Sequence, residues 1–266
     1  MQMDHLPEKP MKPVTGNSPG ETREAVCPEH GVFVARNIVR SIWSRCRACE
    51  DVDTAERDRL DAERGALEAD ARHREAVGMA RIPLRFLGNS FESFVVSTDA
   101  QRHALTVVRD FAENFNDNGR KGLGLMLAGA PGTGKTHLAS ATLQRLIAKR
   151  VCYMTCMDLI RSMRDTWRHN SDQTGTQLLR YLVSLDLLVI DEVGVQYGSA
   201  SEKTILFDVV DLRYREKRST MLVTNQDAEG FEGLLGDRSF DRIKQTNTWV
   251  PFDWPSYRPT ARRAEA

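Results

Sequence analysis

The stretch from Gly129 to Thr136 constrains the fold of this chain more than any other, because its letters GAPGTGKT match the phosphate-loop pattern G-x-x-x-x-G-K-[ST]. Ahead of it, the apolar run Leu125–Ala128 predicts a buried parallel strand. Behind it, apolar residues recur at helical spacing from His137 to Lys149. Glycines let the backbone wrap around phosphates, and the N–H groups at a helix start point toward the anion. The order strand, loop, helix therefore predicts a nucleotide-binding site.

The loop also carries two side chains with separate predicted tasks. Lys135 is expected to reach the β- and γ-phosphates, and the Thr136 hydroxyl is expected to hold Mg²⁺. The predicted cofactors of this site are therefore ATP and Mg²⁺. The predicted nucleotide-binding residues of the loop are Gly129, Pro131, Gly132, Thr133, Gly134, Lys135 and Thr136.

Two acidic residues follow a second apolar run, Leu187–Ile190. A buried strand there would aim Asp191 at the Mg²⁺ shell, and Glu192 can polarise a water molecule for attack on the γ-phosphate. The next predicted strand ends at Asn225, whose amide can contact the γ-phosphate or the attacking water, or else cap a turn. Strands that alternate with helices across this region predict an α/β fold with a parallel sheet.

Four potential metal ligands lie close together near the N-terminus. Fifteen residues separate the pair Cys27 and His30 from the pair Cys46 and Cys49, and this spacing is typical of a tetrahedral zinc site. A segment of this size has too small a core to fold alone, so bound Zn²⁺ would supply its stability. The alternative is three reduced thiols beside an unrelated histidine.

These features predict four regions along the chain. Residues 1–24 are expected to form a disordered tail and residues 25–50 a zinc-binding module. Residues 51–80 are highly charged with a thin apolar stripe, which predicts an exposed linker helix. Residues 81–266 are expected to form the ATPase domain.

The overall composition argues against several classes of protein. Lys plus Arg and Asp plus Glu each number 37, so the net charge favours neither a nucleic-acid nor a membrane partner. No apolar run approaches the ~18 residues of a membrane span, and residues 1–20 lack the apolar core of a secretory signal. We therefore expect a cytoplasmic protein with no membrane partner, whose five cysteines are reduced or metal-bound.

Beyond the two motifs above, four segments form a specific combination: 158–167, 224–225, 235–242 and 254–258. With them, the stretch from Ile82 to Arg258 resembles the AAA+ ATPase domain of DnaC/DnaI-type bacterial helicase loaders, most closely the DnaC branch. The resemblance implies a P-loop fold with a five-stranded parallel sheet flanked by helices. The zinc-binding module departs from the DnaC branch and is more similar to the DnaI branch and to phage or prophage loaders.

The resemblance implies roles for residues outside the motifs. Asn225 matches sensor 1, Arg258 matches sensor 2, and Arg242 matches the arginine finger that reaches the nucleotide of a neighbouring subunit. The predicted catalytic set is Lys135, Asp191, Glu192, Asn225, Arg242 and Arg258. The implied partners are a DnaB-type replicative helicase, single-stranded DNA and other copies of the chain in an ATP-dependent oligomer.

The predicted DNA-binding residues are Arg161, Arg164 and Trp167, on a helix that matches the family's element facing single-stranded DNA. Arginine pairs with phosphate, and tryptophan offers a stacking face to an unpaired base. The alternative for Trp167 is packing within its own domain.

The function that this resemblance implies is ATP-dependent loading of the replicative helicase during initiation of DNA replication. Two alternatives remain open: an IstB-type helper ATPase for transposition, which shares the core, and a zinc adaptor that senses nucleotide without hydrolysing it. A DnaA-type initiator is less consistent, because eight residues after Arg258 are too few for a helix-turn-helix domain.

Overall fold

The predicted alternation of strands and helices forms a parallel sheet in the computed structural model. The structure describes residues 19–39, 42–168, 173–194 and 199–257. The chain divides into two units, residues 1–70 and residues 71–266. The nucleotide-binding motif lies in the larger unit.

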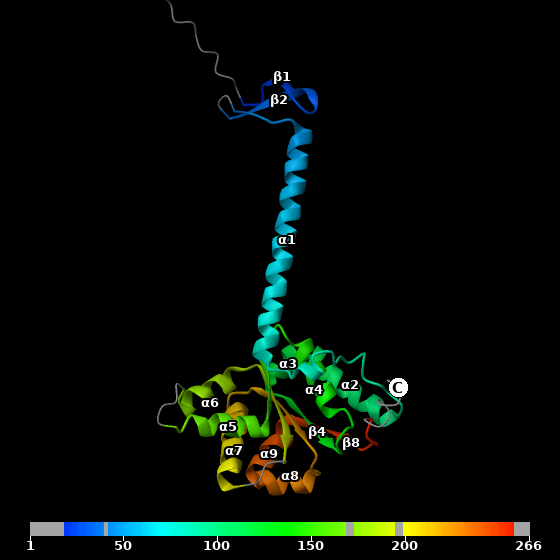
Figure 1. Ribbon diagram of the computed structural model, residues 1–266, viewed down its shortest axis with the longest axis vertical. Coiled ribbons are helices and arrows are strands. Elements are labelled where there is room, and N and C mark those ends of the chain that lie inside the picture. Colours follow the sequence, from blue (N-terminus) through cyan, green and yellow to red (C-terminus); the bar gives the residue numbers. More distant parts are fainter. Residues whose placement is uncertain (1–18, 40–41, 169–172, 195–198, 258–266) are drawn as a thin grey trace, which may run out of the picture. The chain divides into compact units, whose positions relative to one another are not determined.

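The larger unit contains five parallel strands in the order β5-β6-β7-β4-β8 (Figure 1). They are β4 (Gly124–Gly129), β5 (Val151–Thr155), β6 (Leu187–Val193), β7 (Ser219–Thr224) and β8 (Asn247–Phe252). This arrangement confirms the predicted α/β class and the five-stranded sheet. Strand β8 was not located from the sequence, because exposed polar residues and Pro251 interrupt its apolar pattern.

Helices cover both faces of this sheet, as the burial of alternate strand residues requires. In β4, Leu125 and Leu127 belong to one core cluster, whereas Met126 belongs to the other. The first cluster packs against α2 (Asp99–Glu113), α3 (Phe115–Lys121), α4 (Lys135–Arg145) and the short 3-10 helix η1 (Leu84–Phe86). The second packs against α5 (Cys156–Asp165), α6 (Gly175–Ser184), α7 (Ala200–Arg215), α8 (Ala228–Leu235) and α9 (Asp237–Thr246).

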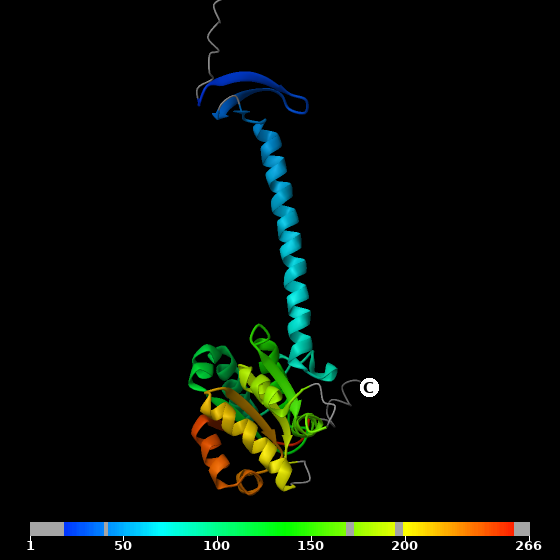
Figure 2. The same ribbon diagram turned by 90° about the vertical axis from the view of Figure 1, so that its left-hand side faces the viewer.

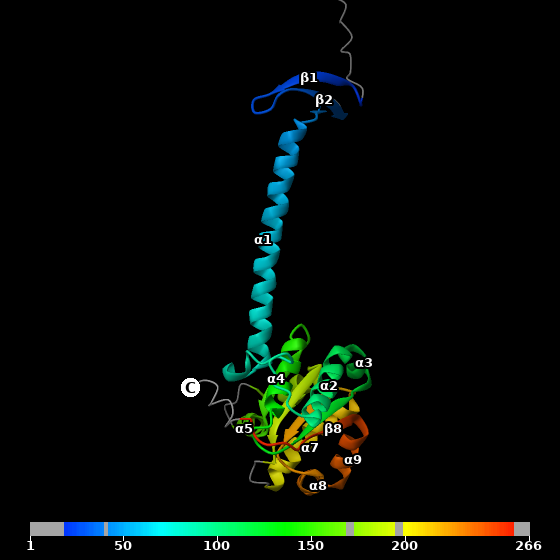
Figure 3. The same cartoon turned by 90° about the vertical axis from the view of Figure 1, so that its right-hand side faces the viewer.

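Two side views show these layers. The yellow helix α7 lies in front of the sheet in Figure 2, whereas α2 and α4 lie in front in Figure 3. Each βα connection starts at a carboxyl end of the sheet, and each αβ connection returns to an amino end. The sheet therefore has two distinct edges, and the phosphate loop after β4 lies at the carboxyl edge.

The smaller unit contains a three-stranded antiparallel sheet of β1 (Thr22–Cys27), β2 (Gly31–Val39) and β3 (Ile42–Trp43). Strand β1 begins at Thr22, inside the region predicted as a tail, and residues 1–18 lie outside the described residues. Helix α1 (Arg47–Ala80) follows and includes the charged segment 51–80. Ala80 is its buried residue, so the helix is solvent-exposed along most of its length.

One helix boundary differs from the sequence-based expectation. The helix predicted to carry Trp167 ends at Asp165, and Trp167 lies in the turn that follows. Within the described part of the chain, no helix combines the length and the apolar character needed to cross a bilayer.

Candidate nucleotide site and metal cluster

The phosphate loop has the backbone conformation that its glycines permit. Gly132 and Gly134 have φ angles of 80° and 96°, in the left-handed region that side chains disfavour. A Cβ atom at Gly134 would lie 2.6 Å from the ring of Phe94, so that position also needs glycine for space. The buried Lys135 donates from Nζ to the carbonyl oxygens of Gly129 and Ala130, at 2.7 and 2.8 Å. Its ammonium group therefore lies within the curve of the loop.

The Asp191 carboxylate joins the second acidic motif to this loop. Thr136 Oγ1 donates to Asp191 Oδ2 at 2.8 Å, although the two residues are 55 positions apart. The backbone N–H of Glu192 donates to Asp191 Oδ1 at 2.7 Å. A hydroxyl and a carboxylate in contact are the hard oxygen ligands that suit Mg²⁺. The donor set thus fits the predicted ion, which Thr136 and Asp191 would hold.

A buried tyrosine forms another contact with the same carboxylate. Tyr153 lies on β5 and donates from its phenol to Asp191 Oδ2 at 2.9 Å. Burial and the adjacent carboxylate raise the pKa of Tyr153, so the phenol remains a proton donor at neutral pH. Tyr153 was not among the predicted site residues, because a tyrosine in an apolar strand has the same pattern as any core aromatic residue.

Glu192 leaves the regular geometry of its strand. Its φ angle is 58°, rare for a residue with a side chain, and the β6–β7 register shifts between Ile190 and Val193. Asp191 is consequently buried while Glu192 is exposed at the carboxyl edge. Strained residues of this kind cluster at functional sites.

Asn225 immediately follows the neighbouring strand β7 and is exposed. Thr224 Oγ1 donates to the carbonyl of Val193 at 2.7 Å and so fastens the tip of β7 to the tip of β6. Because β6 and β7 are adjacent and parallel, Asn225 lies on the same edge as Glu192.

The segment after β8 supports the loop from behind. Trp254 Nε1 donates to the carbonyl of Thr133 at 2.9 Å, and the backbone N–H of Tyr257 donates to that of Gly132 at 2.9 Å. This segment was identified from the sequence by resemblance, but its contact with the loop was not predicted. Arg258, the predicted sensor 2, lies outside the described residues.

Arg242 lies apart from the phosphate loop of its own chain. Its guanidinium pairs with the Asp211 carboxylate and lies 5.5 Å from the ring centroid of Tyr214. Both partners are on the last two turns of α7, and the chain then enters the amino end of β7. A single chain therefore does not bring Arg242 together with Lys135 and Glu192.

The predicted DNA-binding residues differ in their surroundings. Arg164 Nη2 lies 3.1 Å from the buried carboxylate of Glu202, and Arg161 Nη1 lies 3.9 Å from Asp158. Trp167 has 62% of its surface exposed. The indole is therefore available for stacking, whereas the two guanidinium groups already have carboxylate partners.

The four predicted zinc ligands converge in the smaller unit, with their ligand atoms within 4.8 Å of one another. Cys27 Sγ lies 3.6 Å from both Cys49 Sγ and His30 Nδ1, and Cys49 Sγ lies 3.3 Å from His30 Nδ1. Ligands of a tetrahedral Zn²⁺ are about 3.5–3.8 Å apart, given bond lengths of about 2.0–2.3 Å. The donor types and spacings therefore fit zinc.

One thiol of this cluster favours the thiolate form. The backbone N–H of Glu29, together with the His30 side chain and N–H, lowers the pKa of the Cys27 thiol to about 6. The neighbouring Cys27 sulfur raises the pKa of Cys49 to about 12. A thiolate is the species that binds metal, so Cys27 is prepared as a ligand.

This chain is similar to a family of ATP-binding proteins and to several curated and solved helicase loaders. A family model described as IstB-like ATP binding protein matches residues 50–264, which include the nucleotide site and exclude the metal cluster. The replicative helicase loader DnaC of Buchnera aphidicola (Schizaphis graminum) is 39% identical over 214 residues, covering 76% of this chain and 86% of that protein. The replicative helicase loader DnaC of Escherichia coli K12 is 42% identical over 172 residues, covering 64% of this chain and 69% of that protein. A crystal structure of the DnaC helicase loader has a TM-score of 0.58 and 26% identity, covering 64% of this chain and 99% of that chain.

The cysteine cluster yields a prediction about metal content. We expect about one Zn²⁺ per chain by elemental analysis, lost in the double variant Cys46→Ser/Cys49→Ser because two of four ligands are removed. ATP binding should persist, since the parallel sheet has its own core. Cys156→Ala, which removes a thiol outside the cluster, is the control and should keep its zinc. Full zinc content in the double variant would contradict the assignment.

The Tyr153 phenol yields a prediction about Mg²⁺ dependence. Tyr153→Phe keeps the ring but removes a donor that orients Asp191, and loss of such a supporting contact typically weakens metal binding about 10–100-fold. The Mg²⁺ concentration that half-saturates ATP binding should therefore rise about tenfold, while ATP affinity in EDTA stays unchanged. Tyr181→Phe is the matched control. An unaltered Mg²⁺ titration would exclude the positioning role.

Proposed function

We propose one function for this chain, which belongs to the IstB-like ATP-binding family and, within it, to the replicative helicase loaders of the DnaC type. It delivers a replicative DNA helicase onto single-stranded DNA under the control of ATP. The observation that carries the proposal is the Thr136–Asp191 contact. It unites the phosphate loop with the second acidic motif in a chain whose curated relatives are loaders. The expected setting is the cytoplasm at initiation of DNA replication.

Within this proposal, the nucleotide site hydrolyses ATP. Lys135 neutralises the β- and γ-phosphates, and Thr136 with Asp191 would hold Mg²⁺, which supplies further counter-charge when bound. Glu192 projects from the carboxyl edge and polarises the attacking water. Asn225, on the adjacent strand tip, orients that water or the γ-phosphate. An inert nucleotide sensor would not require Glu192, which argues against the adaptor alternative.

A second subunit completes the site. Arg242 is held by Asp211 in the single chain, and we infer that it turns toward the nucleotide of a neighbouring copy when an oligomer assembles. Asp211 Oδ2 also lies 3.1 Å from Arg215 Nε. The carboxylate would therefore keep one cationic partner after Arg242 leaves, which lowers the cost of the exchange.

The two remaining partners have separate candidate surfaces. Single-stranded DNA would stack on the exposed Trp167, next to Arg161 and Arg164. The helicase would dock on the smaller unit. Exposed valines on one face of β1 and β2 support this docking role, because exposed apolar clusters mark interaction sites; they are Val26, Val32 and Val34.

Co-purification with a replicative helicase tests the loading function. Tagged Glu192→Gln protein should bind ATP, fail to hydrolyse it and retain the helicase in ATP more firmly than in ADP. Lys135→Ala should lose this ATP-dependent difference, because the phosphates lose their counter-charge. Normal turnover by Glu192→Gln would remove Glu192 from catalysis. Retention of a transposase in place of the helicase would instead support the transposition helper.

A mixing experiment tests the shared site. Arg242→Ala should bind ATP normally yet hydrolyse it slowly, because a finger supplied by a neighbour contributes roughly 10³–10⁵ in rate in other phosphoryl-transfer systems. Mixing it with Glu192→Gln should restore part of the activity, since one subunit supplies the arginine and its neighbour the glutamate. If the two variants co-assemble and activity does not return, Arg242 does not act in a neighbouring site.

A further inference from the structure

Three Lys/Arg pairs lie within three residues of the start of a strand in the parallel sheet. Arg120-Lys121 precedes β4, Lys149-Arg150 precedes β5 and Lys217-Arg218 precedes β7. Because these strands are parallel members of one sheet, all three pairs lie at its amino edge. The nucleotide site is at the opposite, carboxyl edge. The chain is neutral overall, so this edge is a local concentration of positive charge.

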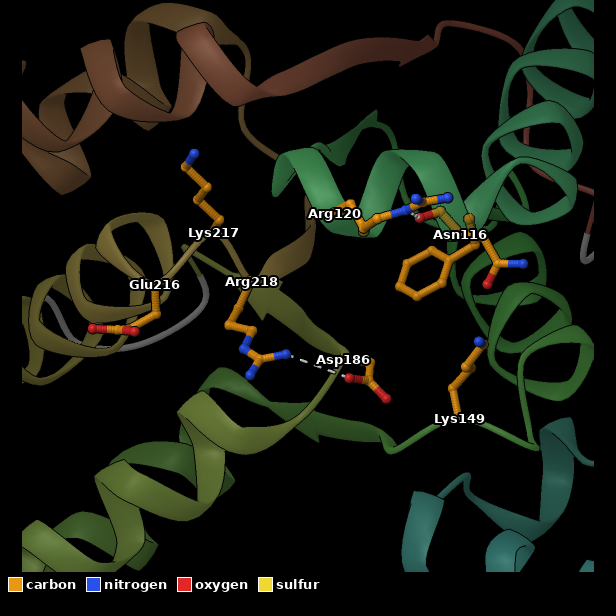
Figure 4. Close-up of a pocket in the computed structure, with 9 residues that line it drawn as sticks. Asn116, Arg120, Lys149, Asp186, Glu216, Lys217 and Arg218 are labelled. Carbon is orange, nitrogen blue, oxygen red and sulfur yellow. Dashed lines mark hydrogen bonds and ion pairs between the residues drawn. The ribbon is translucent and has the colours of Figure 1, made fainter.

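A recess of about 550 Å³ opens among these pairs. Its cationic lining comes from Arg120, Lys149, Lys217 and Arg218, and its acids are Asp186 and Glu216. Figure 4 shows Lys149, Asp186 and Arg218 around this space, with Arg218 pointing toward Asp186. A volume of this size lies in the range of about 300–1,000 Å³ that ligand sites occupy.

The acids of the recess do not neutralise its lysines. Asp186 accepts from the backbone N–H of Arg150 at 3.0 Å and lies 3.5 Å from Arg218 Nη1. Within the described residues, no carboxylate lies within ion-pair distance of Lys149 or Lys217, and both side chains are exposed. The Arg218 Nε atom is buried and has no hydrogen-bond partner among those residues. Arg120 and Arg218 already have carboxylate partners, Asp117 at 2.8 Å and Asp186 at 3.5 Å. The two lysines therefore supply the positive charge of the recess that an anion would satisfy.

The positions of the cations suit an extended anion. Strands β5, β6, β7 and β4 are consecutive in the sheet, so the starts of β5 and β4 are three strand spacings apart, about 14 Å, and Lys149 and Arg120, which precede them, line the same recess. The pair before β7 lies between them. A row of this length matches several successive phosphates of one nucleic-acid strand better than a single small anion.

We propose that this amino edge, defined by Arg120, Lys149, Lys217 and Arg218, contacts the sugar-phosphate backbone of single-stranded DNA. The cations follow the phosphates without reading sequence, as in other sites for unpaired strands. The inference shares nucleic acid as a partner with the proposed function and needs neither ATP hydrolysis nor a helicase.

Salt-dependent binding tests this surface. The full chain carrying Lys149→Ala/Lys217→Ala is titrated against a fluorescent thymidine oligonucleotide at several salt concentrations. Each lost phosphate contact lowers the slope of log K against log[salt] by about 0.7 for a single strand. We expect a slope smaller by about 1.4 and an affinity about tenfold weaker at low salt. ATP affinity and melting temperature should stay unchanged, because both lysines are exposed and lie opposite the nucleotide site.

The matched control is Arg85→Ala/Arg102→Ala, which removes the same charge from exposed positions elsewhere. Wild-type slope and affinity in the lysine variant, or an equal loss in the control, would overturn the inference. An equal loss with a duplex of the same length would overturn the assignment to single strands. Loss of binding to a polyglutamate peptide alone would make the edge a protein-docking surface instead. If Trp167→Ala abolishes DNA binding and the lysine variant does not, the inference falls while the proposed function stands.

Discussion

The carboxyl edge of the sheet depends on the hydrogen bonds that the Asp191 carboxylate accepts. Asp191 is 4% exposed and accepts hydrogen bonds from Thr136, from Tyr153 and from the backbone N–H of Glu192. A buried carboxylate is costly unless it is hydrogen-bonded, so these donors make its burial possible. They also link α4, β5 and β6 through one side chain, which fixes the phosphate loop relative to the acidic motif.

The irregularity in β6 separates the two acids that follow each other in sequence. In a regular strand, neighbouring residues point to opposite faces of the sheet, and both faces here are covered by helices. The positive φ of Glu192 and the register shift before Val193 turn its side chain to the edge instead. This separation suits the roles proposed for the two acids, Asp191 as a ligand of Mg²⁺ within the fold and Glu192 as the group that activates a water molecule at the edge.

The parts of the site that could be predicted from the sequence are those whose residues lie close together along the chain. The residues from Gly129 to Thr136, the pair Asp191 and Glu192, and the cysteine cluster are short motifs whose spacing carries the chemistry. Tyr153 could not be predicted, because its partner depends on strand register: Tyr153 pairs with Val189, which makes Asp191 its diagonal neighbour. The Trp254 contact with Thr133 spans 121 positions and likewise requires the folded sheet.

The amino edge is held by a buried cation, Arg213, whereas the carboxyl edge is held by a buried carboxylate, Asp191. Arg213 is fully buried at the end of α7, and its guanidinium donates to the carbonyls of Leu182, Leu185 and Ser219. Burial lowers the pKa of this group to about 9, so it stays charged at neutral pH and binds carbonyl oxygens in place of a carboxylate. Removing it would leave several buried acceptors without partners, each costing about 1–3 kcal/mol. Because these carbonyls lie in the last turn of α6, at its C-cap just before β6 and at the start of β7, Arg213 holds the loops that carry Asp186, Lys217 and Arg218. The Asp191 carboxylate thus organises the carboxyl edge, which is expected to bind Mg²⁺ with the nucleotide. The Arg213 guanidinium organises the amino edge, where the exposed lysines and arginines lie.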